Sequence, residues 1–385
     1  MEVAYTPADL YRIIKSNKLA VIPGIEVDYM GNFPLTMPDN ADSRAKVDRE
    51  LDRLYSNGVR YIFPIHLSDN AFGGTAIYED MMNVMQKVGT NTFWKMECAA
   101  PRDSINHKYS ALLDSRIRDG LRAGLPIAPA IFEAINQLLP LPPGIKEMVT
   151  PILSGIIASA GVAGNTAGQA ALSVMPDNPP DCGTGHRNSR TLTDIGRYAI
   201  KRMMQKGMMV DIDHMSEYGV HETLKMAMQY NYPVNSGHTG VRDPSASENQ
   251  RTYRMLDTLT TLGGMFGIGW SGQQAGDWVL NYRKGLKGMR YRGVCFGSDA
   301  NSVVYTPKPR PGSNVRYFDG FAAPASYGHT WNYNSDGMAH YGMVRDFIRD
   351  IRNMGNVREL NVLFSSAQEF YLMWQKCDMS KRYIH

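Results

Sequence analysis

Histidines at the ends of predicted strands are the residues of this chain whose type and spacing could do chemistry. His214 follows the apolar run 208–212, and His238 follows the run 232–235. The segment 216–229 between them has helical periodicity, and strands that alternate with helices predict parallel βαβ units. In such folds the side chains just past the carboxyl ends of the strands face one mouth. Two neutral imidazoles there would supply half of a zinc site.

Three more strand ends carry residues of the same kinds. Glu26 and His66 each close an apolar run, and Asp299 follows the run 293–297. One such histidine is more often a capped structural residue, and one such acid is more often a surface group. The five together predict a metal-dependent hydrolase, because a metal lowers the pKa of bound water and polarises a carbonyl, while an adjacent aspartate takes the proton. No glycine motif for phosphate binding or for a nucleophilic serine competes with this interpretation.

The elements that must position these residues form an alternating series. The sequence predicts strands over 19–27, 59–65, 208–212, 232–236, 264–270 and 293–298. It predicts helices over 6–18, 41–57, 192–206, 216–229, 253–262, 278–290, 343–353 and 367–376. The pattern predicts one barrel-type α/β domain over 1–385.

Residues 68–188 interrupt the alternation of strands and helices, since about 120 residues between two core elements is far longer than an ordinary connection. We interpret 68–188 as a mainly helical insertion that serves as a lid or an assembly surface. Its run 148–164 is nearly free of charge and is just long enough to be considered as a membrane span. Proline, serine and many small residues in the insertion favour a helix buried against the barrel or a partner.

Composition excludes few classes of function. The 385 residues carry a net charge of +4 and no run of lysine or arginine, so nothing indicates a nucleic-acid partner. Residues 1–20 show no signal-peptide pattern, and the compartment stays open. The four cysteines form no CxxC pair. Cys295 lies in an apolar run and is predicted to be a buried thiol. The other three cysteines could form a disulfide, but the sequence does not show which of them pair.

A polar loop after His238 supplies candidate residues for binding substrate. It contains Arg242, Arg251 and Arg254. An arginine over a metal site can bind a carboxylate by two parallel hydrogen bonds, although each could also be a plain surface charge.

Several segments resemble the membrane dipeptidase (renal dipeptidase) family, peptidase family M19 of the amidohydrolase superfamily. They are PGIEVD, VRYIFPIHLSDN, TLTDIGRYAIKRMMQKGMMVDIDHMS, PVNSGHTG, LGGMFGIGW and VCFGSDANS, in the family's order and over roughly half the chain. The resemblance implies a (β/α)8 barrel with one or two zinc ions, which hydrolyses dipeptides or related small amides.

The same resemblance implies a role for each candidate residue. Glu26 would bridge the metals, His214 and His238 would bind one zinc, and Asp299 would bind near the other and act as general base. His66 would stabilise the oxyanion. Arg251, or else Arg242, would bind the substrate's terminal carboxylate.

One departure from the family is that no His-x-Asp motif lies upstream of Glu26, although the family's first strand ends in one. We therefore expect a barrel that lacks its first two strands. A second polypeptide or an omitted N-terminal segment would complete it, in a protein that we expect to be a homo-oligomer. Two alternatives stay open, a metal hydrolase of a lactone, cyclic amide or phosphoester and a catalytically degenerate barrel that serves as a scaffold subunit.

Overall fold

The computed structural model describes residues 1–79, 82–109, 181–242, 246–270, 274–299, 306–326, 328–355 and 357–385. Parallel strands form its centre. β3 (Gly24–Glu26), β4 (Tyr61–Phe63) and β7 (Met209–Val210) lie side by side in that order, and so do β8 (Asn235–Thr239), β9 (Met265–Ile268) and β10 (Val294–Phe296). A parallel bridge between Asp211 and Asn235 connects the two groups. The strands therefore follow one another in chain order, and no closed sheet occurs among the described residues.

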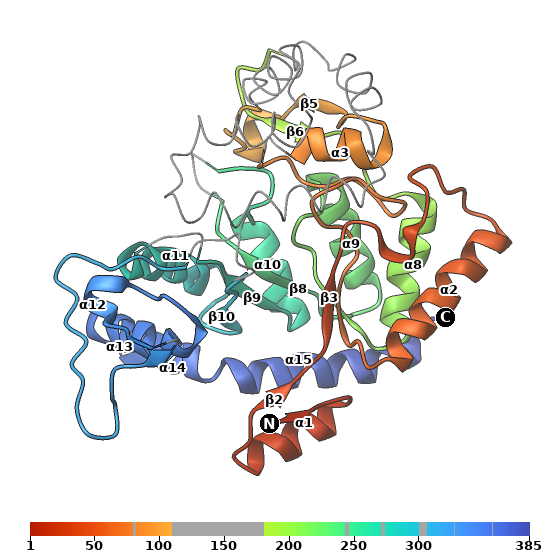
Figure 1. Cartoon of the computed structure of the whole chain (residues 1–385). Helices are drawn as coiled ribbons and strands as arrows, with labels where there is room; N and C mark the ends of the chain where they lie inside the picture. Colours follow the sequence, from red (N-terminus) through yellow and green to blue (C-terminus); the bar gives the residue numbers. More distant parts are fainter. Residues whose placement is uncertain are drawn as a thin grey trace.

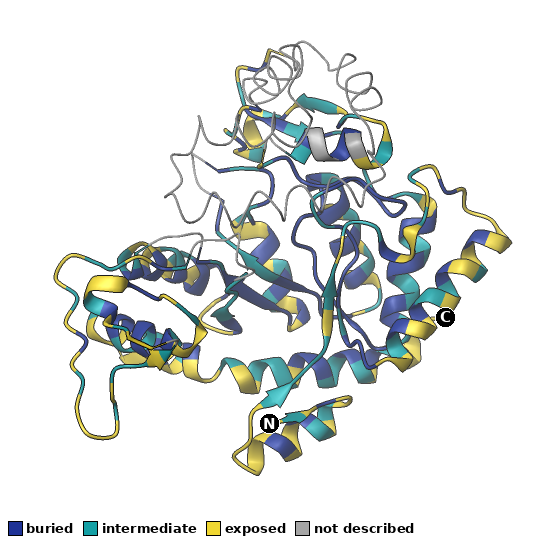
Figure 2. Ribbon diagram, viewed as in Figure 1, coloured by how far each residue is buried: buried dark blue, intermediate teal, exposed yellow. Residues whose placement is uncertain are grey.

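Helices cover this sheet, as the alternating pattern predicts (Figure 1). The helices that follow the strands or close the chain are α2 (Ala41–Ser56), α8 (Asp194–Gln205), α9 (Glu217–Gln229), α10 (Tyr253–Leu262), α11 (Ala275–Gly288), α13 (Val344–Met354), α14 (Val357–Phe364) and α15 (Ser366–Ser380). α8 packs on α2, α10 lies between α9 and α11, and α11 packs on α13. Figure 2 shows β3, at the edge of the sheet, partly exposed and the outer faces of the helices exposed, whereas β7 and β9 are buried, so the apolar core lies between sheet and helices.

Short polar side chains fix where the helices begin. Thr193 accepts a hydrogen bond from the backbone of Gly196 at the start of α8, and Ser216 does the same for Gly219 at the start of α9. Such caps satisfy backbone N–H groups that the first helical turn leaves free. They also place the loop that precedes each helix. The cap of α9 lies two residues after His214.

The opposite end of the sheet is closed by the C-terminal helix. α15 runs beneath the strands and also contacts α1 (Pro7–Lys15) (Figure 1). Lys376 Nζ donates to the carbonyl of Leu262 at 2.7 Å, and Ser380 Oγ donates to that of Asn231 at 3.1 Å. Leu262 ends α10 and Asn231 follows α9, so both carbonyls lie at the ends of helices from which the chain leads into a strand. α15 therefore seals the amino ends, and the carboxyl ends are left for the site.

The described parts of the insertion lie beyond the carboxyl ends of the strands (Figure 1). They contain α3 (Met82–Thr90) and the antiparallel strands β5 (Met96–Cys98) and β6 (His186–Asn188). A disulfide joins Cys98 to Cys182 and so settles the pairing that the sequence left open. The run 148–164 lies outside the described residues. In the part of the chain that the structure describes, no helix is long and apolar enough to span a membrane.

Two predicted strands differ from the structure. The strand expected over 19–27 is two short strands, β2 (Ala20–Val21), which pairs with β1 (Glu2–Val3), and β3. Pro23 separates them, because proline has no N–H to donate to a strand ladder. The strand expected over 232–236 is β8, three residues later. His238 therefore lies within a strand and does not follow one.

The strand β8, which contains His238, has an irregular backbone next to this residue. The register between β8 and β9 shifts between Ser236 and Thr239, as at a β-bulge. Glycine is needed beside it, because a Cβ at Gly267 would lie 1.7 Å from the carbonyl oxygen of Gly237, and one at Gly297 would lie 1.8 Å from the same atom. The three strands approach one another closely at this point. The residues that follow them, including Asp299, therefore lie near His238.

The small elements complete the described chain. They are α12 (Tyr333–Asp336), the antiparallel pair β11 (Ala325–Ser326) and β12 (His329–Thr330), and the 3-10 turns η1 (Met30–Asn32), η2 (Pro101–Asp103), η3 (Tyr341–Met343) and η4 (Lys381–Tyr383).

Candidate metal centre

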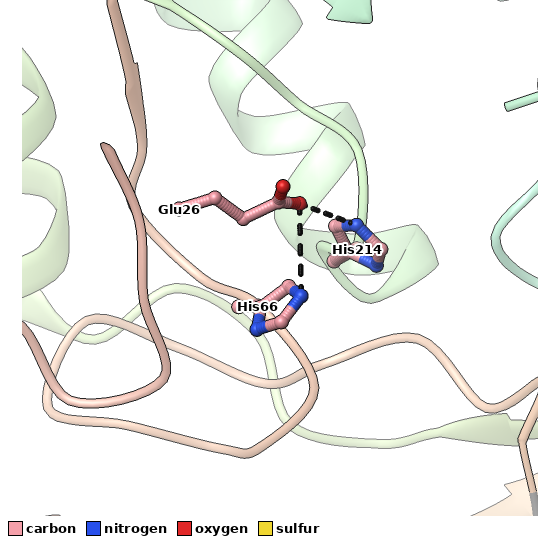
Figure 3. A group of neighbouring side chains, drawn as sticks. All are labelled: Glu26, His66 and His214. Atoms are coloured by element: carbon pink, nitrogen blue, oxygen red, sulfur yellow. Dashed lines mark ion pairs between the residues drawn. The ribbon is translucent and has the colours of Figure 1, made fainter. Parts of the chain in front are cut away.

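Glu26 lies at the centre of the predicted cluster. Its Oε1 atom is 2.8 Å from Nε2 of His214, 3.4 Å from Nε2 of His238 and 3.7 Å from Nε2 of His66. Figure 3 shows the carboxylate directed at His66 and His214, which come from the loops after β4 and β7. Nε2 of His214 is also 2.7 Å from Nε2 of His238. The structure thus brings together side chains that the sequence separates by more than 200 residues.

Asp299 completes the group. Two sets of side chains have donor atoms that all lie within 4.8 Å of one another, Glu26 with His66 and His214, and Glu26 with His238 and Asp299. Glu26 belongs to both sets, as a carboxylate shared by two ions would. All five residues of the metal and oxyanion prediction therefore meet at the carboxyl ends of the strands.

The donor atoms fit a zinc ion. Nitrogen and oxygen ligands at 2.0–2.2 Å from a tetrahedral zinc lie about 3.4 Å apart. The separations of 2.7, 2.8 and 3.4 Å among Glu26 Oε1 and the Nε2 atoms of His214 and His238 approach that value. Glu26 Oε1 is also buried and accepts no hydrogen bond from the described residues, although three imidazole nitrogens face it. A buried acceptor without a proton donor is the position that a cation would satisfy.

Burial and neighbouring charges set the protonation of the two central histidines. Burial lowers the pKa of His214 well below its ordinary value, and the nearby rings of His238 and His66 lower it further. A neutral imidazole is the form that binds metal. Burial also lowers the pKa of His238, but the carboxylates of Asp213 and Glu26 outweigh this effect and raise it. Burial raises the pKa of Asp299, which suits a group that must take up a proton.

Two residues of the cluster have an unusual backbone. His214 has φ +64° and Asp299 has φ +46°, in the left-handed region that non-glycine residues seldom adopt. The conformation of His214 is fixed from both sides, since its N–H donates to Asn249 Oδ1 at 2.8 Å and its carbonyl accepts from Ala76 N at 2.7 Å. Such conformations persist where the surroundings determine them, and they concentrate at functional sites.

Two aspartates support the histidines. Asp213 accepts the backbone N–H of His238 at 2.7 Å, and the hydroxyl of Ser236 bonds to its other oxygen. Asp28 Oδ1 lies 3.2 Å from His66 Nδ1. Burial raises the pKa of Asp28, but the bond to His66 and its charge lower it overall. We did not predict either aspartate as part of the site, although Asp213 adjoins His214 in DIDH and Asp28 lies two residues after Glu26.

The two candidate arginines are held differently. Arg242 uses all three of its nitrogens within the protein, since it donates to the carbonyls of Gln250, Asp103 and Glu248 and pairs with Glu217 at 2.5 Å. Arg251 is fully buried, and its Nε lies 3.5 Å from Asp213 Oδ1. Its Nε and Nη1 atoms make no hydrogen bond to the described residues. Arg251 therefore differs from Arg242 in having two nitrogens without an acceptor among the described residues.

A cluster of histidines and carboxylates at the carboxyl ends of parallel, helix-covered strands defines the class of metal-dependent hydrolases with a TIM-barrel-like fold. Residues 159–275 match the family model described as membrane dipeptidase, peptidase family M19. The chain is therefore related to the membrane dipeptidase family. This match contains His214, His238, Arg242 and Arg251.

Solved structures of the same class resemble this chain. A crystal structure of an amidohydrolase from Pseudomonas aeruginosa is 10% identical with a TM-score of 0.50, over 98% of this chain and 78% of that one. The probable dipeptidase PvdM from Pseudomonas aeruginosa is 10% identical with a TM-score of 0.51, over 99% and 74%. At this identity the two show the fold alone.

The dipeptidase AC, a metallo peptidase of family M19, is 17% identical with a TM-score of 0.35. The match covers 49% of each chain, so this chain spans about half the length of that relative. A comparison with curated proteins found no significant match.

Proposed function

We propose that this protein is a zinc-dependent hydrolase of dipeptides or related small amides. One observation carries the proposal. The buried Glu26 Oε1 faces three imidazole nitrogens and accepts no hydrogen bond from the described residues. A scaffold would have no use for such an arrangement, because an unsatisfied buried carboxylate costs stability.

The position of each residue in the cluster suggests a separate role for it in hydrolysis. Glu26, His214, His238 and Asp299 would bind the metal. A bound zinc would lower the pKa of a water and polarise the substrate carbonyl. Asp299 would take the proton, and its raised pKa brings the carboxyl closer to the pH of reaction. His66, whose ring Asp28 orients, would donate a hydrogen bond to the carbonyl oxygen as negative charge develops there.

The free donors of Arg251 support a substrate with a carboxylate. Its Nε and Nη1 atoms would bind the terminal carboxylate of a dipeptide, whereas Arg242 has no nitrogen left for that role. A ligand that pairs with buried unsatisfied donors gains more than one that displaces existing bonds. This contrast favours a dipeptide over a neutral lactone.

Substitution of the central ligands tests the proposal. We expect His214→Ala and His238→Ala to lower the zinc content measured by elemental analysis to background. They should abolish hydrolysis of a dipeptide panel as well. His329→Ala is the matched control, because His329 is exposed and lies in the remote β12. Full hydrolysis by the His214→Ala variant would refute the metal mechanism. Turnover of a lactone or phosphoester without turnover of any dipeptide would refute the substrate class.

A further inference from the structure

His214 makes a contact that the family match does not include. The hydroxyl oxygen of Tyr78 lies 2.7 Å from His214 Nδ1, and the two ring centres are 5.7 Å apart with 36° between the planes. Tyr78 belongs to the insertion and is 136 residues away in sequence. It contacts the ring nitrogen that does not face Glu26. The two nitrogens of this histidine therefore have separate partners.

We propose that Tyr78 is a positioning residue that fixes the ring orientation and tautomer of His214, so that Nε2 keeps its lone pair toward Glu26. The inference rests on the metal centre proposed above. When Nε2 of a histidine binds a metal, Nδ1 carries the proton and needs an acceptor. The hydroxyl oxygen of Tyr78 is at the right distance to accept it.

The backbone around Tyr78 is held firmly enough for this role. Ser216 N donates to the carbonyl of Gly74 at 2.8 Å, and Ala76 N donates to the carbonyl of His214 at 2.7 Å. Thr75 also pairs with Met215 in an antiparallel bridge. Residues 74–76 thus run alongside residues 214–216 and make the two segments one unit.

Buried carboxylates attach this unit to the rest of the insertion. Glu248 Oε2 accepts the N–H of Ile77 at 2.8 Å and that of Asn188 at 2.9 Å. Asp69 Oδ1 accepts the N–H of Thr75 at 2.9 Å and the side-chain amide of Asn188 at 2.7 Å. These bonds come from Thr75 and Ile77, just before Tyr78, and from Asn188 in β6. Satisfied buried networks of this kind rigidify the segment that they hold.

Close packing limits how far the segment can move. A Cβ at Gly74 would lie 2.4 Å from the carbonyl oxygen of Arg190. The chain at Gly74 is therefore in direct contact with the segment that leads into α8. A rigid segment can hold a hydroxyl at one place, which a positioning role requires.

Tyr78→Phe is the direct test, because it keeps the ring and removes the acceptor. Tyr282→Phe is the matched control. The Tyr282 hydroxyl also makes a buried bond, to the carbonyl of Glu359 at 2.8 Å, but on α11 away from the cluster. We expect Tyr78→Phe to weaken zinc binding 10- to 100-fold in chelator competition, the usual cost of losing a partner of a ligating histidine. We also expect a changed visible spectrum of the cobalt(II)-loaded protein, with Tyr282→Phe matching the wild type in both measurements.

A measurement without metal separates this inference from the proposed function. Nitrogen NMR of the metal-free protein, labelled at histidine, reports the tautomer of His214. We expect one tautomer in the wild type and two in Tyr78→Phe. If the wild type binds no zinc but the tautomer still depends on Tyr78, the metal function fails and the positioning role stands. The same tautomer in both proteins, or unchanged zinc affinity and cobalt spectrum, would overturn the role of Tyr78.

Discussion

Arg251 and Arg242 show how identical side chains in one loop acquire different hydrogen-bond partners. Both are buried, yet Arg242 is saturated by protein acceptors, whereas Arg251 has two nitrogens without a hydrogen bond to the described residues. Sequence position alone could not separate them, because each lies in the same polar segment after His238. The distinction depends on which acceptors the fold brings near each guanidinium.

Arg251→Lys should therefore change substrate binding selectively. Lysine keeps the charge beside Asp213 but cannot form two parallel bonds to a carboxylate. We expect the KM for a dipeptide to rise about tenfold, equivalent to about 1.4 kcal/mol. The KM for the same dipeptide with an amidated terminus should not change. Arg254→Lys, on the exposed start of α10, serves as the control. An equal rise for both substrates would show that Arg251 does not bind the carboxylate.

The residues of the histidine and carboxylate cluster were predictable, and the residues that contact them were not. Glu26, His66, His214 and Asp299 stand at or just after the ends of apolar runs, so a local pattern identifies them. Tyr78 lies just before α3, and nothing in its neighbourhood in the sequence indicates a contact with His214. That contact exists only because the insertion folds back over the loop after β7.

At the scale of elements, a buried ion pair connects α9 with the loop after β8. Glu217 in the first turn of α9 pairs with Arg242 at 2.5 Å, and both side chains are almost wholly buried. Burial raises the pKa of Glu217, but hydrogen bonds from His221 and Arg242 outweigh this effect and lower it to about 2. The ionised form is therefore favoured in the folded protein.

Glu217→Gln should destabilise the protein in a pH-dependent way. Because the folded pKa is depressed, the pair stabilises the fold above the unfolded value of 4.5 and loses this effect as the pH falls toward 2. We expect a loss of about 3 kcal/mol in urea unfolding at pH 7, and a smaller loss at pH 3. Glu369→Gln, which breaks an exposed pair at 3.7 Å, should cost under about 1 kcal/mol. A loss for Glu217→Gln that is independent of pH would contradict this account.

The order of the helices and strands along the chain was more predictable than the residues at which each begins and ends. The helix expected over 253–262 has those bounds, since Thr252 caps it and Gly263, at φ +75°, ends it. β8 begins three residues later than expected, because a buried apolar run does not reveal which of its residues pair. α14 was missed altogether. Its residues 357–364 follow another helix closely, and no strong start or stop signal separates the two.

At the scale of the whole molecule, the structure contains the predicted series of parallel strands, and the placement of the insertion is the main addition. Six parallel strands in chain order follow from alternating patterns and short connections. The sequence analysis interprets 68–188 as an insertion that serves as a lid or an assembly surface. Residues 68–77, at its start, are buried, and Tyr78 contacts His214. Periodicity could not show this, since contacts such as those of Ile77 with Glu248 and of Asp69 with Asn188 are polar and join residues more than 100 positions apart.

The disulfide between Cys98 and Cys182 connects the two described ends of the insertion. It joins residues 84 apart in sequence, and a loop of that size corresponds to about 4.6 kcal/mol of stabilisation in the chain-entropy model. Unfolded protein without reductant should show two reactive thiols, Cys295 and Cys377, and four after reduction. We expect reductant to lower the melting temperature of the wild type but not of a Cys98→Ser/Cys182→Ser variant. That variant should melt at the temperature of the reduced wild type. Four thiols before reduction would rule out the cross-link, and an equal effect of reductant on both proteins would place its stabilisation elsewhere.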